Sequence, residues 1–237
     1  MVGMRKIGLI GGMSWHSTVE YYRMINDAVG ARLGGHHSAR LLLESLDFDE
    51  VRALQLEEDW DGAGRMLAAA GRRLCAAGAE TVLICTNLMH KVAPAVEAAI
   101  DVPLLHIADA VADEALGQGV ETLGLLGTGW VMREPFYAER LGRHGIATVS
   151  PAPADREMID RVIFDELTQG IVRDESRADY VRVIEELASA GAQAVVLACT
   201  EIGLLIGTGD VPIPVIDSAR AHARAAARLA LQPALAV

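Results

Sequence analysis

The sequence has 237 residues, of which 51% are hydrophobic and only 4% aromatic, and its formal net charge is −11. This length can form one large domain or two small ones with a substantial core. The acidic balance, without a basic cluster, argues against nucleic acid or an anionic membrane as a partner.

Targeting and redox signals are weak. No apolar run approaches the roughly 20 residues of a membrane span, and segment 2–13 is too short and too glycine-broken for a signal peptide. Cys75, Cys85 and Cys199 form an odd set without zinc-type spacing, which indicates neither a disulfide framework nor a structural metal. We therefore expect a cytoplasmic protein whose thiols stay reduced.

The first half alternates predicted strands and helices. Its first strand ends in Gly11-Gly12-Met13-Ser14, a turn that can direct backbone N–H groups toward an anion such as a carboxylate. The turn lacks G-x-G-x-x-G spacing, so a dinucleotide fits poorly, and a merely tight turn is the alternative. We predict strands at 5–10, 39–46, 81–84 and 102–106, helices at 17–33, 62–77, 92–100 and 108–116, and a loop or short helix at 47–60 carrying Gln55.

The third predicted strand ends abruptly at Cys85-Thr86-Asn87. A cysteine before two helix-capping residues would lie beside exposed helix N–H groups, an environment that lowers a thiol pKa. A single cysteine of this kind is more simply a small buried hydrophobic residue, and Cys75, on the apolar side of the preceding helix, is interpreted as packing.

A second copy of the pattern favours function for Cys85. Both cysteine strands are entered through Ala-Gly-Ala and left through Cys-Thr, and the second ends at Cys199-Thr200-Glu201. The second half also repeats the glycine turn as Gly127-Thr128-Gly129. We predict its elements as strands at 122–126, 147–149 and up to Cys199, and helices at 155–169, 176–190 and 218–231.

The sequence therefore predicts an α/β protein of two pseudo-symmetric, Rossmann-like parallel-sheet domains. The expected division is residues 1–104 plus 213–237, completed by the C-terminal helix, and residues 105–212. Ligands of such sheets bind at the carboxyl ends of the strands. If the halves face each other about a pseudo-twofold axis, Cys85 and Cys199 line opposite walls of one cleft.

Two facing thiols suit a reaction that removes a proton from one face of a carbon and delivers one to the other, such as inversion of an amino-acid α-carbon. Thr86, Asn87 and Thr200 could donate hydrogen bonds to the substrate carboxylate. Pyridoxal phosphate is disfavoured because the only lysines for a Schiff base, Lys6 and Lys91, stand before the first strand and inside a helix.

Three motifs resemble the aspartate/glutamate racemase family over essentially the whole chain, closest to its broad-specificity amino-acid racemase branch. The resemblance implies a cofactor-independent isomerase and a homodimer, with Cys85 and Cys199 as catalytic residues. It implies substrate contacts from Met13, Gln55, Thr86, Asn87, Leu88 and Thr200, and the neighbouring Ser14 and Glu201 complete the predicted site. The motifs are Ile10-Gly11-Gly12-Met13-Ser14-Trp15, Cys85-Thr86-Asn87-Leu88-Met89-His90 and Cys199-Thr200-Glu201-Ile202-Gly203.

Departures from the family pattern bear on specificity. Aspartate-specific members hold the side-chain carboxylate with an arginine after the second strand and a lysine near Thr168. Here that loop is the acidic segment 47–50, and no lysine lies near Thr168. A neutral or broad amino-acid preference is therefore expected, with Arg52 as a possible substitute cation. His16 replaces a glutamate common in relatives, at a position expected to be peripheral.

Several alternatives stay open. His90 and Glu201 either steer the thiols or serve as caps and packing groups. The chain could be an aspartate or glutamate racemase, a hydantoin racemase or a decarboxylase, although a decarboxylase needs only one thiol. A two-lobed binding protein would explain the duplication but not the matched Cys-Thr strand ends.

Overall fold

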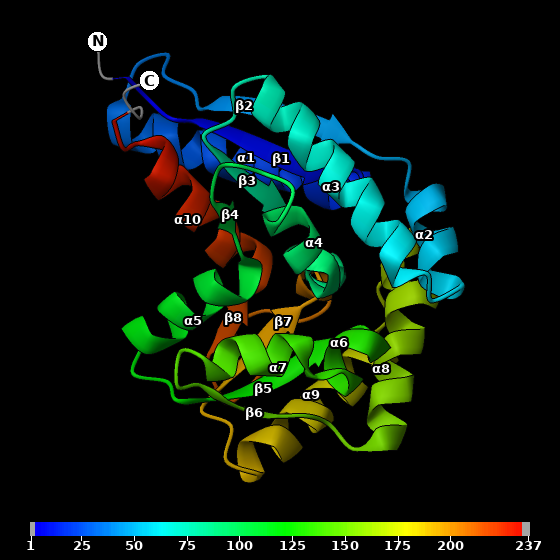
Figure 1. Ribbon diagram of the computed structural model, residues 1–237. Coiled ribbons are helices and arrows are strands. Elements are labelled where there is room, and N and C mark those ends of the chain that lie inside the picture. Colours follow the sequence, from blue (N-terminus) through cyan, green and yellow to red (C-terminus); the bar gives the residue numbers. More distant parts are fainter. Residues whose placement is uncertain (1–2, 234–237) are drawn as a thin grey trace. The chain divides into compact units, whose positions relative to one another are not determined.

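The computed structural model describes residues 3–233, which divide into two compact units (Figure 1). One unit runs to Ile107 and resumes at His222, and the other runs from Ala108 to Ala221. Within the described residues each unit contains a four-stranded, fully parallel sheet surrounded by helices. The predicted fold class, two α/β parallel-sheet domains, is confirmed.

The first unit has the strand order β2-β1-β3-β4. Every residue of β3 is buried, as are the last five of β1, which is typical of parallel strands covered on both faces. Its strands are β1 (Lys6–Gly11), β2 (Arg40–Ser45), β3 (Thr81–Ile84) and β4 (Leu104–Leu105). Its helices are α1 (Trp15–Leu33), α2 (Phe48–Leu56), α3 (Trp60–Ala76), the 3₁₀ helix η1 (Leu88–Val92) and α4 (Ala93–Glu97).

The second unit repeats this order as β6-β5-β7-β8, so each strand has a counterpart at the same place in the other sheet. Its strands are β5 (Thr122–Gly127), β6 (Ala147–Val149), β7 (Ala194–Ala198) and β8 (Val215–Asp217). Its helical elements are α6 (Gly129–Arg133), α7 (Pro135–Gly142), α8 (Pro153–Asp165), η2 (Leu167–Gln169), α9 (Asp174–Ser189) and η3 (Ile202–Leu204). Helices α5 (Ile107–Gly117) and α10 (Ser218–Ala230) contain the points where the division falls.

The division differs from the one expected from the sequence. Residues 213–217 were assigned to the first domain, but β8 pairs in parallel with β7 and so belongs to the second sheet. Hydrogen bonding between strands explains the shift, because a strand's neighbours cannot be read from its own composition. The division then falls inside α10, between Ala221 and His222.

Proline residues and 3₁₀ geometry account for the largest differences between the predicted helices and those of the structure. The segment predicted as one helix at 92–100 begins earlier as η1 and continues as the short α4, which has Pro94 in its first turn. After the second glycine turn the chain forms two helices, because Glu134, which precedes Pro135, is extended. The fourth strand, predicted at 102–106, is reduced to two residues.

Helix α1 buries only part of the face that the sequence predicts. Only Ile25 and Val29 are buried among the residues that stand at helical spacing, Val19, Tyr22, Ile25, Asn26 and Val29. Val19 and Tyr22 were expected on its apolar side but are 53% and 56% exposed. The buried hydrophobic residues of the helix are Tyr21, Ile25 and Val29, spaced four residues apart. Burying Tyr21 costs little because its hydroxyl is hydrogen-bonded to the ring of His222, at 2.9 Å.

None of the helices in residues 3–233 combines the length and apolar character needed to span a bilayer.

Candidate active site

The glycine turn after β1 is held by its own backbone and by the start of α1. The Gly12 N–H donates to Thr18 Oγ1 at 2.9 Å, and the Leu46 N–H donates to the Gly11 carbonyl at 3.0 Å. The hydroxyls of Ser17 and Thr18 donate to the Ser14 carbonyl. The Gly12 N–H is therefore already hydrogen-bonded within the protein. An anion-binding turn, as predicted from the sequence, would instead point this N–H toward the ligand.

Cys85 follows β3 at the same edge of the sheet. Its N–H donates to the Ile10 carbonyl at 2.9 Å, which places the cysteine beside the start of the glycine turn. The side chain of Cys85 is fully buried, and Asn87 and Leu88 are 2% and 5% exposed. Thr86 is only partly buried. The parallel register thus brings the two motifs of the first half together, as expected for strands that end at one edge.

The predicted low pKa of Cys85 is wrong. Burial raises the pKa of this thiol, because removing the thiolate from water disfavours the charged form. The expected helix also differs, since η1 is a short 3₁₀ helix and Asn87, its N-cap residue, makes no side-chain capping bond. Cys85 is therefore a neutral thiol at neutral pH in this structure.

Gln55 on α2 reaches the same edge. Its side chain is 3% exposed, and its Nε2 donates to the sulfur of Met89 at 3.1 Å. Met13 and Met89 belong to one buried cluster. The guanidinium of Arg52 donates to Gln55 Oε1 at 3.3 Å, so the possible substitute cation lies directly beside this predicted site residue. The first unit thus gathers Met13, Gln55 and the Cys85 turn.

Cys199 follows β7 in the equivalent position of the second unit. Its Sγ–H donates to Glu201 Oε2 at 3.2 Å, and the Thr200 hydroxyl donates to the same oxygen at 2.6 Å. The three residues therefore form one small hydrogen-bonded group at the strand end. Burial, together with the nearby Glu201 carboxylate, raises the pKa of Cys199, because both disfavour a second negative charge.

Thr128 is a candidate that the sequence analysis did not single out. It lies in the Gly127-Thr128-Gly129 turn after β5 and is 8% exposed. Within the described part of the chain, its hydroxyl is buried without a hydrogen-bond partner, a rare state that calls for an explanation. Gly127 pairs with Ala198, the residue before Cys199, so both turns share one edge. The duplicated glycine turn was the signal that could have identified it.

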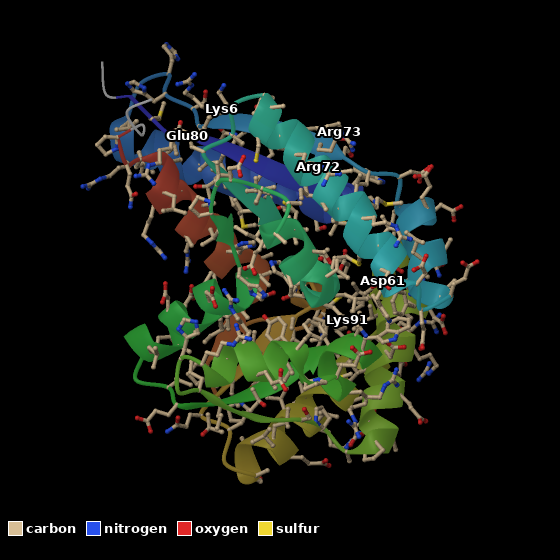
Figure 2. The ribbon with its side chains drawn as sticks, in the orientation of Figure 1. Lys6, Asp61, Arg72, Arg73, Glu80 and Lys91 are labelled. Atoms are coloured by element: carbon tan, nitrogen blue, oxygen red, sulfur yellow. The ribbon has the colours of Figure 1, made fainter. Side chains whose placement is uncertain are left out.

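The chain's only lysines lie apart from these strand ends. Lys6 is at the amino end of β1, where its N–H donates to Glu80 and its Nζ to the Ala77 carbonyl, at 2.9 and 3.1 Å (Figure 2). Lys91 lies in η1 with its Nζ 4.0 Å from the centre of the Trp60 ring. Among residues 3–233 there is no group of three or more His, Cys, Asp or Glu side chains able to hold a metal ion.

A surface groove of the first unit is distinct from the cysteine turn. It lies between α3 and the η1–α4 segment, where Figure 2 labels Asp61, Arg72 and Lys91. Small residues such as Gly64 and Ala68 also line it, whereas Cys85 and Thr86 do not.

His36 and His37 are exposed in the loop after α1. Cys75 packs against the core cluster that contains Leu74, in agreement with its predicted packing role.

Comparison with known proteins identifies relatives of the whole chain. Residues 10–226 match the family described as Asp/Glu/Hydantoin racemase. A provisionally assigned Asp/Glu racemase from Yersinia pestis is 50% identical, with a TM-score of 0.92 over 97% of this chain and 100% of that chain. An aspartate racemase homologue from Pyrococcus horikoshii OT3 is 35% identical, with a TM-score of 0.83 over 96% and 99%. Glutamate racemase from Francisella tularensis, solved with D-glutamate, is 13% identical (TM-score 0.64, 95% and 80% covered) and shares the fold.

Proposed function

The chain belongs to the Asp/Glu/Hydantoin racemase family, and from this premise we propose that it is a cofactor-independent amino-acid racemase in which Cys85 and Cys199 are the two acid–base groups. The observation that carries the proposal is the matched position of the thiols. Each cysteine directly follows the third strand of its sheet, β3 or β7, and each is followed by a threonine. The mechanism requires that the thiols address opposite faces of the substrate α-carbon.

The proposed reaction removes one proton from one face of the α-carbon and delivers one proton to the other face, so protons balance. One cysteine, as thiolate, takes the α-proton and becomes a thiol, which leaves a carbanion stabilised by the adjacent carboxylate. The other cysteine, as thiol, gives its proton to the opposite face and becomes a thiolate. The product is the other enantiomer, and the two cysteines have exchanged protonation states.

The raised thiol pKa values fit a site that becomes competent only with substrate. A neutral thiol in a dry environment is a suitable proton donor, whereas the base must be a thiolate. The ammonium group of an amino acid beside a buried thiol would favour the thiolate by charge attraction and so oppose the effect of burial. The Glu201 carboxylate, which accepts a hydrogen bond from the Cys199 S–H, would orient that thiol.

Groups that could donate to the substrate carboxylate lie at the same strand ends, although the Thr200 hydroxyl would first have to leave Glu201 Oε2. We assign this role to Thr86, Asn87, Thr200 and the unpartnered hydroxyl of Thr128, with Met13, Gln55 and Leu88 shaping the pocket and Ser14 at its edge. Pre-placed donors are worth most where charge develops, because they need no reorganisation. Pyridoxal phosphate is not required, since neither Lys6 nor Lys91 lies at a strand end that holds a cysteine. A homodimer is part of the same proposal.

The decisive test is chiral analysis of single amino acids incubated with dialysed enzyme, without added cofactor. Neutral amino acids such as methionine or homoserine are expected to be racemised with a higher kcat/KM than aspartate or glutamate. The reason is that Asp47, Asp49 and Glu50 make segment 47–50 acidic and that position 168 is a threonine rather than a lysine, so neither supplies a cation for a side-chain carboxylate. An uncompensated buried carboxylate costs several kcal/mol.

Other outcomes of that assay would change the proposal. An aspartate kcat/KM above that of every neutral amino acid would contradict the specificity, and Arg52→Gln would then test whether the arginine beside Gln55 binds the carboxylate. Activity restored only by pyridoxal phosphate would overturn the mechanism. Racemisation of hydantoins alone, decarboxylation, or binding without turnover would identify the corresponding alternative.

Thr128→Val tests the unpartnered hydroxyl. The substitution keeps the shape of the side chain and removes a buried group that has no partner, so the melting temperature should stay unchanged or rise. If the hydroxyl binds substrate, KM should rise about fivefold, the effect of one lost hydrogen bond.

Thr81→Val is a matched control for this measurement. Thr81 is 1% exposed at the amino end of β3, and its hydroxyl is already bonded to the Glu80 carbonyl at 2.9 Å. It should lose about 1 kcal/mol of stability with KM unchanged. A lowered melting temperature and normal KM for Thr128→Val would assign Thr128 to packing.

A further inference from the structure

The first unit buries three histidine rings in one cluster. His90, His106 and His222 are 2%, 4% and 0% exposed. The centroid of the His90 ring lies 4.3 Å from that of His106 and 5.8 Å from that of His222. Buried polar rings are costly unless their nitrogens are hydrogen-bonded, so the partners of these nitrogens indicate what the cluster does.

His90 joins two backbone segments through its two ring nitrogens. Its Nδ1 is 2.8 Å from the Thr86 carbonyl oxygen, and its Nε2 accepts from the Ile107 N–H at 3.1 Å. A carbonyl can only accept and an amide N–H can only donate. The ring is therefore neutral, with its proton on Nδ1.

A hydrogen bond to the Thr86 carbonyl can affect the position of Cys85. This carbonyl belongs to the residue directly after Cys85, in the turn that carries Thr86 and Asn87. The same ring fixes that turn to Ile107, where the first unit ends and α5 begins. Besides this ring contact, the Cys85 N–H is fixed to β1 through the Ile10 carbonyl. His90 therefore restrains the side of the turn that lies away from β1.

The remaining cluster keeps the His90 ring in place. Nε2 of His222 donates to the Leu105 carbonyl at 2.9 Å, so its Nδ1 accepts from the Tyr21 hydroxyl at 2.9 Å. These two contacts tie α10 to β4 and to α1, whose labels can be found in Figure 1. Helix α1 follows the Gly12-Met13-Ser14 turn, so the cluster links both motif turns of the first unit.

We infer that His90 is a positioning residue for the proposed racemase reaction: its neutral ring, with the proton on Nδ1, holds the Thr86 carbonyl and so sets the place of the Cys85 thiol. This inference rests on the proposed function. It predicts an effect on proton transfer through Cys85 and none on transfer through Cys199, which lies in the second unit. A misplacement of about 1 Å can cost about 100-fold in rate.

Two substitutions separate the two ring contacts. His90→Asn keeps a donor close to the position of Nδ1 and loses the acceptor for Ile107. His90→Gln keeps an acceptor close to the position of Nε2 and loses the donor to Thr86. Each variant loses one hydrogen bond, so both should lower the melting temperature by similar amounts. Both variants break the link between Thr86 and Ile107, but only His90→Gln also leaves the Thr86 carbonyl without its donor, so it should disturb the Cys85 turn more.

The readout is exchange of the substrate α-hydrogen with deuterated buffer, measured in a Cys199→Ser and in a Cys85→Ser background. These backgrounds isolate transfer through Cys85 and through Cys199. His90→Gln should lower exchange at least about tenfold with Cys199→Ser and less than twofold with Cys85→Ser. His90→Asn should stay within about threefold of the parent in both. Equal losses in both backgrounds, or no loss, would overturn the inference.

Failure of the proposed function would look different. If neither single-cysteine background exchanges the α-hydrogen while His90 is intact, the two-base mechanism is contradicted. The positioning role of His90 in that reaction is then contradicted as well. Nitrogen NMR of the wild-type protein gives an independent check, with His90→Gln used to assign the signal. A neutral ring with the proton on Nδ1 is expected, and a proton on Nε2 would overturn the inference whatever the activity.

Discussion

Replacing either Cys85 or Cys199 by serine should abolish racemisation while leaving one half of the proton chemistry intact. Serine is nearly isosteric with cysteine but far less acidic, so it cannot act as the base near neutral pH. Racemisation should fall by about 10³-fold or more, within the range that positioned acid–base groups contribute. Chiral chromatography of the reaction over time measures the loss.

The remaining thiol in each variant should still act on the enantiomer that it faces. It should remove that α-proton and return a solvent deuteron to the same face, so each variant exchanges one enantiomer without inverting it. The two variants should prefer opposite enantiomers. Cys75→Ser is a suitable control, because Cys75 packs against the core on α3 and is not part of the proposed chemistry. Full racemase activity in either the Cys85 or the Cys199 variant would rule out the two-base mechanism.

Gly12→Ala should destabilise the protein by several kcal/mol. Gly12 has φ of +89°, and a methyl group on its Cα would lie 2.1 Å from the Leu46 carbonyl oxygen and 2.6 Å from the Leu46 nitrogen. These are backbone atoms, and the Leu46 N–H is bonded to Gly11, so they cannot move without opening the turn. Left-handed backbone costs an alanine about 1 to 2 kcal/mol, and overpacking adds about 1 to 3 kcal/mol.

Gly119→Ala is the matched control. Gly119 has φ of +73°, but a methyl group there would meet nothing within 4 Å. It should therefore cost only the backbone contribution, about 1 to 2 kcal/mol. Urea unfolding of both variants measures the difference, and equal losses would show that the contact with Leu46 is not rigid. Because Gly12 precedes Met13 and Ser14, activity should fall in Gly12→Ala and stay normal in Gly119→Ala.

The repeated motifs were the most informative part of the sequence. Buried parallel strands are short apolar runs that end in turn residues, and this pattern located β1, β3, β5 and β7 within a residue or two. The matched Cys-Thr ends predicted equivalent places in two sheets, and both sheets have the same strand order. Local composition is nearly enough here because a strand covered on both faces is mostly apolar, and the polar residue of β3, Thr81, has its hydroxyl bonded to the Glu80 carbonyl.

Elements set by non-local contacts were harder to predict. The buried face of α1 was predicted only in part: of two adjacent tyrosines Tyr21 is buried and Tyr22 exposed, and the hydroxyl of Tyr21 is hydrogen-bonded to His222, 201 residues away. The domain boundary was misplaced for a related reason, since the pairing of β8 with β7 decides where residues 213–217 belong. Neither partner is visible from the segment itself.

By itself, then, the sequence determined which chemical groups are present: two thiols at equivalent strand ends, hydroxyl and amide donors beside them, and two lysines placed elsewhere. Only the tertiary structure decided the state of those groups. The motif around Cys85 predicted a lowered pKa, but the fold removes the thiol from water and raises it. Among the described residues it also leaves the Thr128 hydroxyl without a hydrogen-bond partner, and it holds the Thr86 carbonyl through His90. A residue's type is written in the chain, whereas its protonation and orientation depend on the solvent, charges and partners that folding brings around it.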